Sequence, residues 1–160
     1  MPKDYFNDPA AQTTGRIFPA SPQALMFERL VSEMQSTLDE DVFFDDSDWP
    51  HGFDWANEAE AVWDGLAEDA TLLAKFHTRS PADQMLCRAA GLIYRAIRAG
   101  SPHELDAVRV KLAEIMNLPA PANVHFLLEQ AELSFEQMAD RAKAGELEPP
   151  ETDLGPTPRA

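Results

Sequence analysis

Apolar residues recur every three or four positions along five segments of this chain. The segments cover roughly residues 22–39, 55–77, 81–99, 102–117 and 123–144. Because a 3.6-residue period places such positions on one face of a helix, the pattern predicts five amphipathic helices. The residues expected on the buried faces are Phe27, Leu30, Val31, Met34, Leu38, Ala59, Val62, Trp63, Leu66, Ala70, Leu73, Leu86, Ala90, Ile93, Ile97, Leu105, Val108, Leu112, Ile115, Val124, Leu127, Leu128, Ala131, Phe135, Met138 and Ala142.

Ser-Pro pairs mark the expected start of three of these helices. Serine is a favoured N-cap residue, and proline suits the first helical position because its missing N–H has no partner there in any case. Two of the serines are followed three residues later by an acid, Asp83 or Glu104, as in a capping box. The three pairs are Ser21-Pro22, Ser80-Pro81 and Ser101-Pro102.

No segment shows the sustained alternation of apolar and polar residues that is typical of a strand. The sequence therefore predicts an all-α fold, with a single compact domain of about five helices over residues 21–145. Residues 1–20 are expected to form a loop-like segment whose apolar side chains clasp the core. Residues 146–160, with four prolines, are expected to form a disordered tail. A loop over about residues 40–54 is expected between the first two helices.

The charge distribution changes this picture most between Leu30 and Ala74, where the chain has thirteen carboxylates and no Lys or Arg. The formal net charge of the whole chain is −15, so this stretch carries most of it. Such a stretch repels itself unless solvent, a cation or a basic partner balances the charge. The carboxylates belong to Glu33, Asp39, Glu40, Asp41, Asp45, Asp46, Asp48, Asp54, Glu58, Glu60, Asp64, Glu68 and Asp69.

The acidic region, residues 39–69, predicts a non-catalytic interaction protein that engages a basic surface of a partner protein. Glu60, Asp64 and Glu68 follow at intervals of four, which spaces their charges about 6 Å apart along a helix. DNA has one phosphate per about 3.4 Å of each strand, so one version of this prediction is an inhibitor that mimics nucleic acid. The residues expected to bind the partner are Asp45, Asp46, Asp48, Trp49, Asp54, Glu60, Asp64 and Glu68.

Other interpretations of the acidic region remain open at this point. In one of them, the carboxylates form a solubilising surface and bind no partner. The aromatic residues of the expected loop either anchor it onto the helices or provide the hot spots of an interface, where Trp is enriched. These aromatic residues are Phe43, Phe44, Trp49, Phe53 and Trp55.

The loop resembles a calcium site in composition, through Asp46, Asp48, His51 and Asp54. An EF-hand loop needs an oxygen ligand at its fifth position and glycine at its sixth. Counted from Asp46, these positions hold Pro50 and His51, so the pattern fails. The sequence predicts no metal site and no cofactor.

The chain has no recognisable catalytic signature. The histidines are scattered, and no HExxH, G-x-S-x-G or P-loop motif occurs. Cys87 lies mid-helix and is expected to be a buried, inert thiol. A DNA-binding helix-turn-helix is disfavoured because Asp106 and Arg109 stand where apolar residues should turn inward. A small helical enzyme or ligand-binding domain with an unrecognised pocket remains the alternative, and a helical assembly subunit is a further one.

Basic residues concentrate in residues 75–111, which hold seven bases and three acids. Arg88, Arg95 and Arg98 are expected on one side of the third helix, paired with carboxylates of the same chain. Gly91 lies among them and costs about 1 kcal/mol of helix stability relative to alanine. We therefore expect a close approach of another helix at Gly91.

Composition also predicts where the protein works. One cysteine allows no internal disulfide, which suits a reducing compartment. The chain does not start with the apolar run of a signal peptide, and no segment has the apolar length of a membrane span. A cytoplasmic location is therefore expected. The negative charge argues against nucleic acid or a membrane as a direct partner.

Overall fold

The structure is a computed structural model that describes residues 21–46 and 55–147. No strand occurs within these ranges, and the predicted all-α fold is confirmed. The predicted N-terminal segment, residues 1–20, and nearly all of the predicted tail lie outside the described residues. The helices are α1 (Pro22–Asp46), α2 (Trp55–Ala74), α3 (Pro81–Ile97), α4 (Pro102–Met116) and α5 (Ala122–Leu147).

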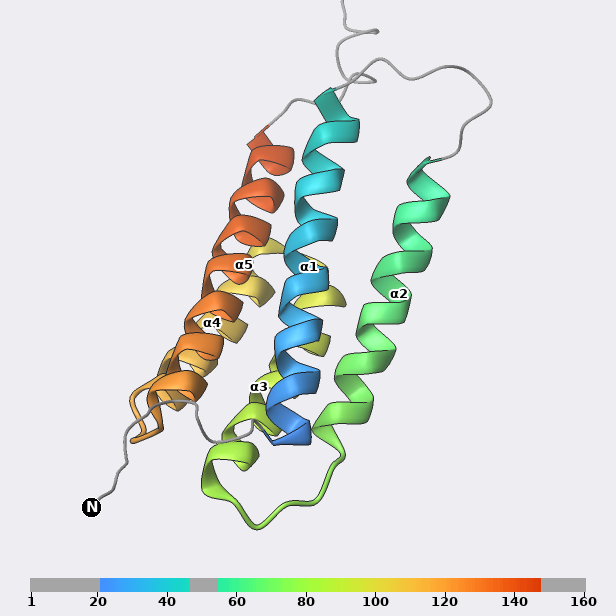
Figure 1. The fold of residues 1–160 in the computed structure, drawn as a ribbon. Coiled ribbons are helices and arrows are strands. Elements are labelled where there is room, and N and C mark those ends of the chain that lie inside the picture. Colours follow the sequence, from blue (N-terminus) through green and yellow to red (C-terminus); the bar gives the residue numbers. More distant parts are fainter. Residues whose placement is uncertain (1–20, 47–54, 148–160) are drawn as a thin grey trace, which may run out of the picture.

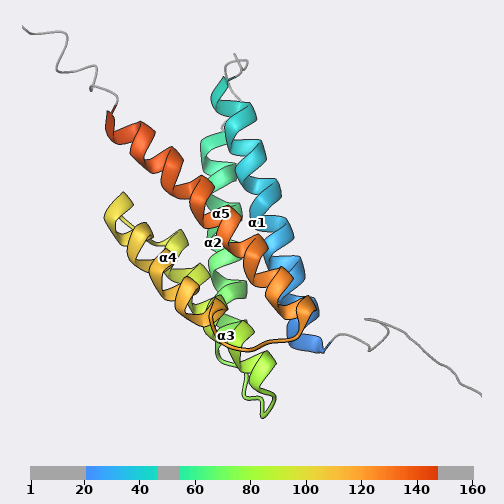
Figure 2. The same ribbon diagram turned by 90° about the vertical axis from the view of Figure 1, so that its left-hand side faces the viewer.

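Each helix packs against the next one along the chain, and α5 closes the bundle by packing against α1. α1 and α5 run in the same direction and α2 runs back beside α1 (Figure 1). In the side view, α5 lies between α4 and α1 (Figure 2), both of which it contacts. As a result, the C-terminal ends of α1 and α5 and the N-terminal end of α2 lie at the same end of the bundle (Figure 1).

The core is built from one apolar face of each helix, as the periodicity predicts. Phe27 of α1, Leu112 of α4 and Phe135 of α5 are fully buried. The central helix α3 contributes mostly small and aliphatic side chains. Among the predicted core residues, five are only partly buried: Ala59, Trp63, Ile97, Met138 and Ala142.

The prediction that Val62 is buried is wrong. Its side chain is 45% exposed. The buried face of α2 is centred on Leu66, Ala70 and Leu73, and Val62 lies at the edge of this face. Period alone identifies the face, but it does not determine how far the neighbouring helix reaches over each edge.

The predicted serine caps of α3 and α4 are confirmed. The Ser80 hydroxyl oxygen accepts a hydrogen bond from the backbone N–H of Asp83 at 3.2 Å. The Ser101 oxygen accepts one from the N–H of Glu104, also at 3.2 Å. The Glu104 carboxylate reaches back to the N–H of Gly100 at 2.6 Å, close to the reciprocal bond of a capping box.

The Asp83 carboxylate has a role that the local pattern does not predict. Instead of reaching back to its own cap, it accepts a hydrogen bond from the Ser21 hydroxyl at 2.7 Å. The Ser21 oxygen in turn caps α1 by accepting the N–H of Ala24 at 3.0 Å. The starts of α1 and α3 are thereby linked by a side-chain pair, and this link fixes where α1 lies over the core.

α1 is longer than predicted, and the expected loop over about residues 40–54 is wrong in its first part. The helix continues to Asp46. No Pro or Gly interrupts the chain between Pro22 and Pro50, so no backbone restriction ends the helix earlier. A hydrogen bond from α2 also holds this extension: the indole N–H of Trp63 donates to the Asp41 carboxylate at 2.9 Å.

Gly91 and Gly65 both have room for a methyl group, so the expected close approach at Gly91 is wrong. A Cβ at Gly91 would lie 3.9 Å from the Cβ of Ala74, an ordinary contact, and one at Gly65 would have no neighbour within 4 Å. We expect Gly91→Ala and Gly65→Ala each to raise the free energy of unfolding by about 1 kcal/mol, because alanine loses less backbone entropy in a helix. Urea denaturation measures both changes, and a loss of stability in either variant would contradict this packing.

Candidate partner-binding surface

The residues predicted to bind a partner fall into three groups. Glu60, Asp64 and Glu68 are exposed side chains of α2. Asp45 and Asp46 are the last two residues of α1, where the structure describes the backbone only. The other three predicted residues lie outside the described ranges: Asp48, Trp49 and Asp54.

α1 ends and α2 begins at the same end of the bundle (Figure 1), and both segments are rich in acidic residues. Glu40, Glu58 and Glu60 are exposed there, and none of them has a hydrogen bond or an ion pair with another described residue. Asp39 and Asp41 lie on the same part of α1. We call these five residues the acidic end.

The helix dipole of α1 adds to the negative charge at the acidic end. α1 terminates there and has no basic residue in its last turn. The C-terminus of a helix carries about half a negative charge, and a carboxylate near it typically costs about 0.3–1 kcal/mol. The two aspartates that close α1 are thus unfavourable for the helix itself. Helix stability does not explain why acids are placed here.

Two carboxylates of the acidic stretch have structural partners. Asp41 accepts the indole N–H of Trp63 at 2.9 Å, which joins α1 to α2. Asp64 forms an ion pair with Arg98 at 2.8 Å, which joins α2 to α3. The row formed by Glu60, Asp64 and Glu68 is therefore partly neutralised at its centre.

Internal pairing of the three arginines is confirmed for Arg98. Its guanidinium binds Asp64 and lies 5.9 Å from the centre of the Tyr94 ring. The hydrogen bond with Asp64 raises the pKa of Arg98 above its ordinary value. Arg88 and Arg95 are exposed and have no ion-pair partner in the part of the chain that the structure describes.

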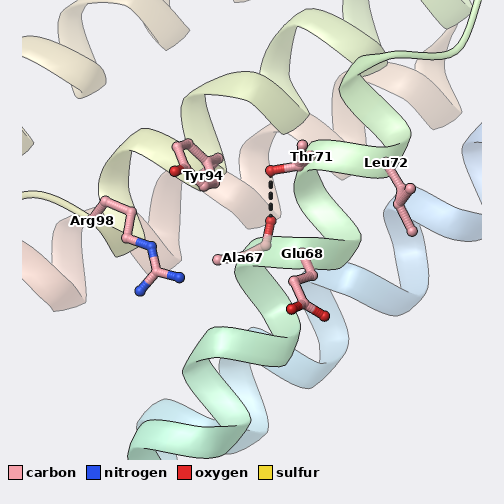
Figure 3. A pocket seen from close by; sticks show the side chains of 6 residues that line it. All are labelled: Ala67, Glu68, Thr71, Leu72, Tyr94 and Arg98. Atoms are coloured by element: carbon pink, nitrogen blue, oxygen red, sulfur yellow. Dashed lines mark hydrogen bonds between the residues drawn. The ribbon is translucent and has the colours of Figure 1, made fainter.

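An open groove of about 400 Å³ runs between α2 and α3 (Figure 3). Tyr94 and Arg98 line it from α3, and Leu72 and Glu68 from α2. The Thr71 hydroxyl is already bonded to the carbonyl oxygen of Ala67 at 2.9 Å (Figure 3). Arg98 is also engaged, whereas the Glu68 carboxylate has no hydrogen bond or ion pair with another described residue, so this groove favours a cationic group.

The described residues contain no cluster of three or more His, Cys, Asp or Glu side chains with the geometry of a metal site. His125 lies 3.4 Å from the Glu129 carboxylate on the surface of α5, one helical turn away. Both side chains are partly exposed, at 41% and 51%.

Cys87 is buried in α3. Burial, with a smaller contribution from the charge of Asp83, raises the pKa of its thiol above the ordinary value. A raised pKa leaves less thiolate at any given pH, and the thiolate is the reactive form. We expect the folded protein to react with a thiol reagent at pH 8 at least about tenfold more slowly than the urea-unfolded chain. Equal rates in the two states would contradict the buried position of Cys87.

Sequence reasoning missed the exposed apolar side chains on the outer face of α2. Leu72 is 60% exposed, Phe76 is 46% exposed, and Val62 is exposed as noted above. A signal for them was present, because positions 62, 65, 69, 72 and 76 are also spaced by three and four residues. α5 has a comparable outer surface, with Phe126 and Leu133 more than half exposed.

No protein-family model matches this chain, and no curated protein or solved structure is significantly similar to it. None of the helices within the described ranges has the length and apolar character needed to cross a membrane.

Proposed function

We propose that this chain is a non-catalytic interaction protein that binds a basic surface of a partner protein through its acidic region, residues 39–69. The observation that supports the proposal is the unpartnered state of Glu40, Glu58 and Glu60. These carboxylates have no described partner, although the chain itself supplies arginines and lysines elsewhere. A basic surface of a partner would form favourable charge interactions with these carboxylates, which have none with other described residues.

A narrower version of the proposal is inhibition of a nucleic-acid-binding protein. The spacing of Glu60, Asp64 and Glu68 along α2 supports it, while the pairing of Asp64 with Arg98 weakens the row. Glu58 and Glu40 extend the negative surface beyond the row toward the end of α1. In this version the partner contacts the acidic end as it would contact a run of phosphates. Binding of this protein therefore displaces nucleic acid from the partner.

The proposal places the interaction in the cytoplasm, because the lone cysteine is buried and a reducing compartment suits it. Catalysis is not part of the proposal. A helical assembly subunit is a second candidate, because exposed apolar residues on α2 and α5 support it.

Affinity capture tests the proposal. Wild-type protein and a variant with Glu40→Gln, Glu58→Gln and Glu60→Gln are immobilised, and bound proteins are identified by mass spectrometry at low and high salt. We expect the wild type to retain a basic protein at low salt, and the variant to retain much less of it. For the inhibitor version, added DNA or RNA should compete with this protein for the captured partner.

The matched control is the α5 variant Glu129→Gln, Glu132→Gln and Glu136→Gln, which removes the same formal charge. It should retain the partner nearly as well as the wild type. If the two triple variants lose the partner equally, net charge alone explains capture and the acidic end is not the binding surface.

A further inference from the structure

The outer face of α2 has the pattern of a helix–helix interface with no helix on it in the described structure. Val62, Gly65, Asp69, Leu72 and Phe76 follow one another at alternating intervals of four and three residues. The first four lie on one face of α2, and Phe76 continues the stripe in the turn after the helix. This spacing is the one that lets two helices pack along a common seam.

Grooves flank this face on both sides. On the α1 side, Asp69 lies in a groove of about 190 Å³ with the apolar Leu25 and Met26 and the charged Arg29 and Glu33. On the α3 side, Leu72 lies in the groove of about 400 Å³ with Tyr94 (Figure 3). Leu25 is 55% exposed and Met26 36%, so the apolar surface continues across α1, α2 and α3. α2 is thus a ridge over which a partner side chain can enter a groove on either side.

Gly65 and Asp69 determine what kind of helix fits. At Gly65 no atom lies within 4 Å of the position a Cβ would take, so a partner backbone can approach closely. Asp69 is exposed and has no hydrogen bond or ion pair with another described residue. A helix that covers this face should carry a cation opposite Asp69, because carboxylates outnumber the one cation in its groove, Arg29, and burying an unpaired carboxylate is costly.

A second copy of this chain does not meet that requirement. In a parallel pair of α2 helices, Asp69 faces Asp69. In an antiparallel pair centred on the stripe, whose middle residue is Asp69, Asp69 again faces Asp69. Each arrangement brings two carboxylates face to face, and the net charge of −15 on each chain opposes association further.

We propose that the outer face of α2 binds an amphipathic helix of a partner protein. The helix carries apolar residues at alternating three- and four-residue intervals and a Lys or Arg opposite Asp69. Its further basic residues meet Glu58, which continues the stripe one turn before Val62, and Glu68, which lies beside the stripe. This inference deepens the proposed function, on which it rests, by specifying a helix as the basic partner element.

A labelled synthetic peptide tests this inference with the full chain. The probe is a helical peptide of about 20 residues, with leucine along one seam, lysine at the central seam position and further lysines beside the seam. The control peptide has the same composition in scrambled order, so it keeps the charge and loses the seam. Fluorescence anisotropy measures affinity, and NMR shift changes locate the bound face.

Protein variants test the stripe directly. We expect Gly65→Gln and Asp69→Asn each to lower the affinity for the patterned peptide by at least about fivefold. The first substitution blocks the close approach of the peptide backbone, and the second removes the ion pair. Leu72→Ser should weaken it similarly, while Leu133→Ser on α5, which removes an equally exposed leucine, should leave it unchanged. Gly65→Gln removes a helix-destabilising glycine at an open position, so the variant should remain folded.

Tighter binding of the patterned peptide by at least about tenfold, with shifts at Val62, Asp69 and Leu72, supports the inference. Equal binding of the patterned and scrambled peptides overturns it, while the proposed charge-driven function survives. A sedimenting dimer that Leu72→Asp dissociates would overturn it in favour of a second copy. Shifts of residues 1–20 in the spectrum of Leu72→Asp would overturn it in favour of the chain's own N-terminal segment.

Discussion

Replacing Phe135 with alanine is expected to lower the free energy of unfolding by about 3–5 kcal/mol. Phe135 lies in α5 and has no exposed surface, within a cluster to which all five helices contribute. Its removal loses the transfer free energy of the ring and leaves a cavity that the rigid neighbours fill only in part. Urea denaturation measures the change, which is a large fraction of the stability of a domain of this size.

Phe126→Ala is the matched control for Phe135→Ala. The same side chain is removed from the same helix, but Phe126 is 57% exposed. The expected change is within about 0.5 kcal/mol, as for most surface substitutions. If Phe126→Ala destabilises the protein as strongly as Phe135→Ala, then α5 packs with a different face inward.

Replacing Trp63 with alanine is expected to lower the free energy of unfolding by about 2–4 kcal/mol. Trp63 is partly buried against the core, and its indole N–H donates to Asp41. The substitution therefore removes both packing and the bond that holds the C-terminal extension of α1 against α2. Circular dichroism should also show lower helix content, because this extension loses its side-chain hydrogen bond from α2.

Trp63→Phe separates the hydrogen bond from the packing. It retains most of the ring and should cost about 1–2 kcal/mol, as should Asp41→Ala, which removes the acceptor oxygens. Because the two groups bond to each other, the double variant should lose clearly less than the sum of the single variants. Additive losses would mean that Asp41 and Trp63 do not interact in solution.

The faces of the helices were predictable from the sequence because burial repeats with the helical period. Every predicted core position of α1 and α4 is buried. The serine caps of α3 and α4 were predictable for a similar reason, since serine and proline act within one turn. These serine caps are local and form in both helices, although the Asp83 carboxylate bonds to Ser21 at the start of α1.

Interactions between distant segments were not predictable in the same way. Asp83 bonds to Ser21, far away in sequence, and Asp64 pairs with Arg98 of another helix. One sequence contains many acids and bases, and only the packing of α2 on α3 selects this pair. The helical extension of α1 was missed because its acids suggested a loop, whereas Trp63 holds part of it against α2.

The acidic region was located from the sequence, but its organisation was not. Counting charges finds the stretch, yet it cannot show that Asp41 and Asp64 are engaged while Glu40, Glu58 and Glu60 are without described partners. The exposed stripe on α2 was missed because its three- and four-residue spacing resembles that of a buried face. A buried and an exposed apolar stripe on one helix can be told apart only when the neighbouring helices are known.

The most direct test of the proposed function is the association rate constant with a captured basic partner, measured by stopped flow between about 50 and 200 mM salt. The proposal predicts a rate that falls steeply as salt rises. At low salt it should be about tenfold lower for the variant with Glu40→Gln, Glu58→Gln and Glu60→Gln, because charges at the contact steer the encounter. The variant with Glu129→Gln, Glu132→Gln and Glu136→Gln should change the rate by less than about twofold. A rate that is independent of salt, or equal in the two triple variants, would contradict the proposal that the acidic end binds the partner.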